Sequence, residues 1–188
     1  RFSINTYKVK AMVNGGGGVI SPSSQKVTHN GTAAITISPA TGYRIDSIVD
    51  NGRSMPVANP YVINKVTEDH TVVVTFAIST YRVRASVNGG RGGTVSPASQ
   101  TVNHGGTATI TIAPDTDYYI ESITDNGVSK PVTNTYSIKG VAENHEVIVS
   151  FAEKGGGHGK RYTITAVTAG SGGKVTPSAQ TVEAGGTV

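Results

Sequence analysis

The 188-residue sequence has no cysteine and no tryptophan, and only 15% of its residues are charged. The lack of cysteine excludes disulfides, thiolate nucleophiles and cysteine zinc sites. No stretch approaches the ~18 consecutive apolar residues that a membrane-spanning helix needs, so we expect no membrane insertion. Without covalent cross-links, stability must come from packing and from the hydrogen bonds of sheets.

Charge of either sign is scarce, and the excess is small. The net charge is +4 and the isoelectric point is near 9.3. Such an excess permits an anionic partner, but it lacks the clustered basic residues of a nucleic-acid-binding protein. Tyr7, Tyr43 and Tyr61 recur in phase with core positions and leave no exposed platform for stacking bases. We therefore expect no nucleic-acid partner.

What the sequence does contain is an internal repeat. Tyr7 opens a first copy and Tyr81 opens a second, and from Pro22 onward the two copies keep a constant offset of 75 residues. A third copy opens at Tyr162 and stops at Val188, before its later strands. Self-similarity at a fixed period predicts tandem modules, each with its own core.

The repeat predicts where the modules begin and end. Phe2 matches Phe76 at the end of the first copy, so the chain resembles a window on a longer array. A glycine-rich linker should couple the second and third repeats less stiffly than the first and second. The predicted segments are the tail of a preceding repeat at 1–6, a first repeat at 7–77, a linker at 78–80, a second repeat at 81–152, a glycine-rich linker at 153–161 and a partial third repeat at 162–188.

Within each copy the apolar residues recur with a period of two. Tyr7, Val9 and Ala11 alternate with Lys8 and Lys10, as expected for a strand with one face inward. No stretch shows helical spacing. We predict an all-β fold of tandem small antiparallel modules, each β-sandwich-like or β-grasp-like, with two complete modules and one partial module joined end to end.

Turn residues and apolar phase predict further details. Asp50-Asn51-Gly52 tolerates the positive φ of a tight hairpin turn. The inward phase changes between Ile45 and Ile48. Phe76 and Phe151 each end a Val-x-Val-x-Phe strand, so we expect them to be equivalent core anchors.

Several motifs together resemble a known family. They are Gly18-Val19-Ile20-Ser21-Pro22, Gly42-Tyr43-Arg44-Ile45, Asn51-Gly52 and Val72-Val73-Val74-Thr75-Phe76. They resemble the divergent internalin-type B-repeat, which occurs in tandem in secreted and surface-anchored bacterial proteins. The resemblance implies a compact β fold likened to a β-grasp, an extracellular or cell-surface location, and a role in spacing, display or adhesion. It supplies no catalytic residue.

The histidines and acids recur at equivalent positions in both copies, which indicates a role in each fold or a site repeated in each module. His70 and His145 should point inward at the start of the last strand. A metal or catalytic role is conceivable, but we favour a rim histidine bonded to a turn. Asp115-Thr116-Asp117 and Asp50-Asn51-Gly52 lack the acid density of a calcium loop.

The glycine runs, such as Gly15 to Gly18, are poor candidates for phosphate loops. A phosphate cradle needs a following helix, whereas strands are expected here, so we interpret the runs as hairpin turns. We therefore predict no catalytic residue, no cofactor site and no metal site.

Four cations should face outward, two on the first strand of each complete copy. They are Lys8, Lys10, Arg82 and Arg84. Stacked modules could align them into a contact surface for a polyanion. The stronger alternative is that outward cations protect a strand edge against aggregation.

Our leading hypothesis, which rests on the repeat, the lack of a unique polar constellation and the B-repeat resemblance, is a non-enzymatic extracellular structural region that acts as a stalk, a spacer or the body of a fibre on a bacterial surface. The alternative is an adhesin-like module that weakly binds glycans, anionic polymers or cell-surface polysaccharide. The expected partners are further repeats of the same chain, or neighbouring copies that complete the third repeat by strand complementation.

Overall fold

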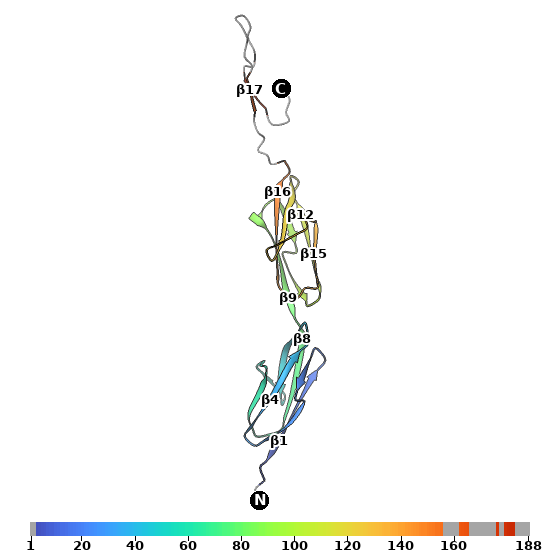
Figure 1. Cartoon of the computed structure of the whole chain (residues 1–188), viewed down its shortest axis with the longest axis vertical. Helices are drawn as coiled ribbons and strands as arrows, with labels where there is room; N and C mark the ends of the chain where they lie inside the picture. The colour runs from blue at the N-terminus through green and yellow to red at the C-terminus, as the bar shows by residue number, and fades with distance from the viewer. Residues whose placement is uncertain (1–2, 156–161, 166–175, 177–178, 183–188) are drawn as a thin grey trace.

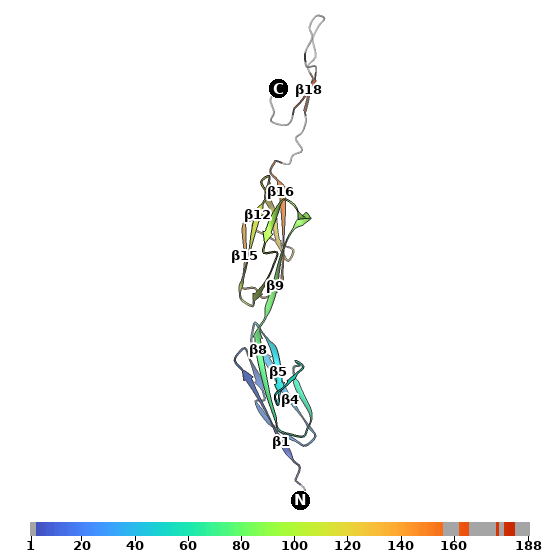
Figure 2. The ribbon, with the colours of Figure 1, turned by 180° about the vertical axis from the view of Figure 1, so that it is seen from behind.

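The computed structural model describes residues 3–155, 162–165, 176 and 179–182. Two all-β modules follow one another along the chain, and they lie end to end in both views (Figures 1 and 2). A two-stranded ribbon of β17 (Tyr162–Thr165) and β18 (Ala179–Val182) follows them. The prediction of a tandem all-β fold is confirmed.

Module 1 is a sandwich of a five-stranded and a three-stranded sheet. The strand orders are β3-β1-β8-β5-β6 and β2-β4-β7. Its strands are β1 (Thr6–Asn14), β2 (Gly18–Ser21), β3 (Ser24–Thr28), β4 (Gly31–Pro39), β5 (Tyr43–Asp50), β6 (Arg53–Met55), β7 (Tyr61–Val66) and β8 (His70–Ile78).

Module 2 repeats this topology, with strand orders β11-β9-β16-β13-β14 and β10-β12-β15. A short 3-10 turn, η1 (Asn88–Gly90), lies next to Arg91, where the copies differ by an insertion. The strands are β9 (Thr80–Val87), β10 (Gly93–Ser96), β11 (Ser99–Asn103), β12 (Thr107–Pro114), β13 (Tyr118–Asp125), β14 (Val128–Lys130), β15 (Thr135–Lys139) and β16 (His145–Glu153).

One strand pair in each module departs from the antiparallel pattern. The first and last strands, β1 with β8 and β9 with β16, are hydrogen-bonded neighbours that run parallel, while the other pairs within the modules are antiparallel. Parallel neighbours bring the chain in at one end of a module and out at the other. The fold itself therefore directs successive modules into a line.

The two modules have separate cores, because the two buried clusters share no residue. Each cluster combines inward side chains of both sheets, as the period of two predicted. The phase change before Ile48 is a β-bulge between Ile45 and Ser47. Phe76 is buried at 8% exposure, and its equivalent Phe151 is half-buried against the second core.

The interpretation of the first glycine run as a hairpin turn is wrong. The run joins β1 to β2, which belong to different sheets. A β carbon at Gly18 would lie 2.5 Å from Cζ of Phe76, and one at Gly93 would meet Phe151 in the same way. Glycine is needed there because an aromatic ring packs directly against the backbone.

The expectation that a neighbouring strand completes the third repeat falls largely on residues outside those described. Within the described part of the chain, no helix combines the length and apolar character needed to cross a membrane.

Candidate functional site

A buried carboxylate at the end of β5 organises the most polar part of the core. Asp50 is 7% exposed. Nδ1 of His70 lies 2.9 Å from its Oδ1, and the Tyr61 hydroxyl donates to its Oδ2 at 3.0 Å. Module 2 has the same cluster: Nδ1 of His145 lies 2.8 Å from Asp125, and the Tyr136 hydroxyl donates to Asp125 at 2.9 Å.

Burial and the neighbouring carboxylate both act on the tyrosine of each cluster. Burial, with the hydrogen bond to Asp50, raises the pKa of Tyr61 to about 12, and the pKa of Tyr136 is raised to about 12 in the same way by Asp125. The tyrosine therefore stays a hydrogen-bond donor at neutral pH. Each Asp–His–Tyr cluster satisfies its own polar groups inside one module, which favours a structural role.

The histidine in each cluster bonds to the aspartate of the Asp-Asn-Gly turn. The sequence placed His70 at the module rim, but it did not pair His70 with Asp50, which lies on a neighbouring strand. The next turn residue, Asn51, donates to the Asp69 carbonyl at 2.9 Å and accepts from the Thr71 amide at 2.8 Å. In the described part of the chain, no three histidine or acidic side chains gather as a metal site would require.

The four predicted cations, Lys8, Lys10, Arg82 and Arg84, are exposed. The two arginines line a hollow of about 290 Å³ beside His145 and Glu146. Asn144 also lines this hollow, and its side chain accepts a hydrogen bond from the Arg82 amide at 2.8 Å. The sequence predicted the outward arginines but not the histidine that shares their hollow, because His145 is placed there by the parallel pairing of β9 with β16.

Module 1 differs at this position. Asp69 accepts the equivalent hydrogen bond from the Lys8 amide at 2.7 Å, so an acid stands where module 2 has the neutral Asn144. Module 2 in turn carries Glu146 where module 1 has Thr71, so each pair of cations has one neighbouring acid, and the two positions differ chiefly in presenting guanidinium rather than ammonium groups.

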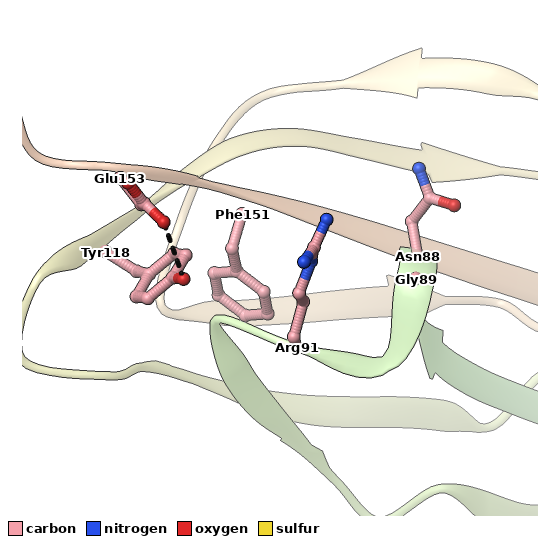
Figure 3. A pocket seen from close by; sticks show the side chains of 6 residues that line it. All are labelled: Asn88, Gly89, Arg91, Tyr118, Phe151 and Glu153. Atoms are coloured by element: carbon pink, nitrogen blue, oxygen red, sulfur yellow. Dashed lines mark hydrogen bonds between the residues drawn. The ribbon is translucent and has the colours of Figure 1, made fainter. Parts of the chain in front are cut away.

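A second hollow, of about 350 Å³, lies where β16 ends (Figure 3). The Tyr118 hydroxyl donates to Glu153 at 3.1 Å, and this bond raises the pKa of Tyr118. Figure 3 shows the Phe151 ring between Tyr118 and Arg91. Glu153 stands where module 1 has Ile78, so module 1 lacks a negative charge at this position. The only indication of this hollow in the sequence was the insertion at Arg91.

The junction between the modules is a direct contact. The Ser79 amide donates to the Gly42 carbonyl at 2.8 Å, and the His104 amide donates to the Ser79 carbonyl at 2.8 Å. The His104 ring lies directly against Gly42. Hydrogen bonds and packing therefore connect the end of module 1 to the start of module 2.

A protein-family model described as the divergent InlB B-repeat domain matches residues 7–80 and 83–155. The chain belongs to this family. The two matched segments correspond to the two complete modules, so each module is one B-repeat. Comparisons with curated proteins and with solved structures found no match.

Comparing the two B-repeats distinguishes the polar groups that they share from those that differ. The Asp–His–Tyr cluster and the turn asparagine occur in both and bond within each repeat. The charged residues of the two hollows differ between the repeats. The recurring Asp–His–Tyr cluster and turn asparagine therefore serve the fold, whereas the hollows are where the two repeats differ in charge.

Proposed function

We propose that these tandem B-repeats are a non-enzymatic spacer of an extracellular bacterial surface protein, holding other parts of that protein away from the cell or forming the body of a fibre. The observation that carries this proposal is the parallel pairing of the first and last strands. Because the chain enters one end of each repeat and leaves at the other, an added repeat adds length.

Two further observations support the spacer. The connection between the repeats is short, since β8 ends at Ile78 and β9 begins at Thr80. The shared polar groups are occupied within each fold, so repetition multiplies a structural unit. The B-repeat resemblance implies a secreted or surface-anchored protein, in which such spacing is useful.

The spacer can be tested by changing the number of repeats. Deleting residues 6–79 joins Asn5 to Thr80 and keeps the register, because Asn5 corresponds to Ser79; duplicating the same segment adds one repeat. On a bacterial surface, we expect antibody access to an N-terminal tag to fall after deletion and to rise after duplication. Arg82→Ala/Arg84→Ala is the matched control and should leave access unchanged. Access that is independent of repeat number would refute the spacer.

A second candidate function is weak binding of anionic polymers, and the hollow beside Arg82 and Arg84 favours it. Two guanidinium groups beside a histidine can hold sulfate, phosphate or carboxylate groups. Binding of the chain to heparin, as a probe, should weaken with salt and should be lost in Arg82→Ala/Arg84→Ala. Lys8→Ala/Lys10→Ala is the control and should retain most binding. Equal losses in both double variants would indicate attraction by net charge alone.

A further inference from the structure

Each complete module begins with the same arrangement around a histidine. In module 2 the His104 amide donates to the Ser79 carbonyl at 2.8 Å, and the ring centroids of Tyr81 and His104 lie 5.9 Å apart. We call Ser79, Tyr81 and His104 the histidine face of module 2.

Module 1 carries the same face. The His29 amide donates to the Asn5 carbonyl at 2.8 Å, and the ring centroids of Tyr7 and His29 also lie 5.9 Å apart. Asn5, Tyr7 and His29 form the histidine face of module 1. The two faces are therefore built alike before any neighbour is considered.

The two faces differ in what covers them. The histidine face of module 2 contacts the turn of module 1 that contains Gly42, and both His104 and Ser79 are half-buried. The equivalent His29 and Asn5 are exposed. The histidine face of module 2 is thus covered by the Gly42 turn, whereas the histidine of the equivalent face in module 1 is open to solvent.

The occupant has to be a glycine turn. Gly42 has φ +79°, and a β carbon there would lie 2.7 Å from Cγ of His104, closer than packed carbon atoms approach. The equivalent turn of module 2 carries Asp117, which is exposed and does not have positive φ. In the third repeat, Ala184 stands at the position of His104. The sequence therefore pairs glycine with histidine at one junction, and aspartate with alanine at the next.

We propose that the histidine face is a docking socket for the glycine turn of another B-repeat, and that the exposed face of module 1 accepts a repeat with glycine at the Gly42 position. The inference rests on the proposed spacer function and adds its rule of assembly. A Gly–His pair fixes the angle between two repeats, whereas a turn like that of Asp117 does not fit the socket. Without such an interface, neighbouring domains move relative to each other.

The existing junction tests the first half of the rule. The chain has no cysteine, so Ser54→Cys and Ser129→Cys, at equivalent exposed positions, can carry two spin labels. Electron-spin distance measurements should give a narrow distribution. Gly42→Asp should broaden it about twofold or more, because the repeats then move independently. Gly15→Asp is the control, since Gly15 also has positive φ but has no atom within 4 Å of a β carbon.

A double-mutant cycle separates loss of docking from loss of folding. His104→Ala should broaden the distribution by itself, and Gly42→Ala should add little in that background, because the clashing ring is gone. Circular dichroism must show unchanged melting of both modules. A distribution that stays narrow in both Gly42→Asp and His104→Ala would overturn the proposal.

The second half of the rule needs an added repeat. In a fusion of residues 3–79 to residues 6–188, the glycine turn of the added repeat meets the histidine face around His29. Labels at the two copies of Ser54 should give a distribution as narrow as that of the native junction. His29→Ala, or aspartate at position 42 of the added copy, should broaden it. A broad distribution in the folded fusion would refute the socket, while tag access that still rises with repeat number would leave the spacer standing.

Discussion

The two complete repeats are alike inside and different at their distal ends. Both contain the same strand order, the same parallel central pair and the same buried Asp–His–Tyr cluster. At the distal ends, module 1 presents Gly42 and Ile78, whereas module 2 presents Asp117 and Glu153. The two repeats therefore share their buried groups and differ in the side chains that lie where a following repeat would begin.

The difference has a physical basis in the contacts of each end. Gly42 is half-buried against His104 of the next module, so this position accepts only a residue without a β carbon. Asp117 is exposed, and its carbonyl accepts from the Lys154 amide at 2.6 Å, as the Gly42 carbonyl accepts from Ser79. The backbone turn is retained while the side chains that would contact a neighbour change.

The largest effect should follow removal of the buried carboxylate. Asp50→Ala leaves His70 and the Tyr61 hydroxyl without their partner, so we expect about 3 kcal/mol or more of lost stability in module 1. Asp125→Ala should do the same in module 2. Urea unfolding followed separately for each module measures both. Asp46→Ala, which removes an exposed ion pair with Arg44, is the control and should cost less than about 1 kcal/mol. Unequal responses of the two modules would contradict their common interior.

An effect of comparable size should follow truncation of the ring that ends each central strand. Phe76→Ala and Phe151→Ala should each destabilise their module by about 3 to 5 kcal/mol, with Phe151→Ala at the lower end because Phe151 is half-buried. Thermal melting of the two variants compares them directly. A larger loss of stability for Phe151→Ala than for Phe76→Ala would contradict the deeper burial of Phe76.

How much of this was predictable depends on the range of each interaction. Alternation of apolar residues predicts the strands and the inward phase of Phe76, because both are local properties of a strand. The parallel pairing of β1 with β8 joins residues about sixty positions apart, and no local pattern encodes it. The partnership of His70 with Asp50 was missed for the same reason. The outward arginines were predictable, but the hollow that they share with His145 required the register of β9 and β16.

The glycine run offers an intermediate effect and a contrast within one loop. Gly18→Ala places a methyl group against the Phe76 ring, and overpacking of this kind costs about 1 to 3 kcal/mol. Gly15→Ala meets no neighbour but forces a positive φ on alanine, at about 1 kcal/mol. Chemical denaturation of the two variants should rank Gly18→Ala above Gly15→Ala. The opposite ranking would mean that backbone strain, rather than ring packing, determines the need for glycine.

The smallest effect is a pH dependence that both modules should share. Since the pKa of Tyr61 is raised to about 12 from 10.0, its protonated form is favoured by folding. The resulting stability is fully present below pH 10 and is lost as the pH rises through about 12. Tyr61→Phe and Tyr136→Phe should each remove this part of the alkaline decline from their own module, at about 1 kcal/mol of stability at neutral pH. Denaturation between pH 9 and pH 12 measures the slope, with the exposed Tyr119→Phe as control. If the alkaline slope of a module is unchanged in its Tyr→Phe variant, the hydroxyl does not bond to the carboxylate, and the shared cluster reduces to the Asp–His pair.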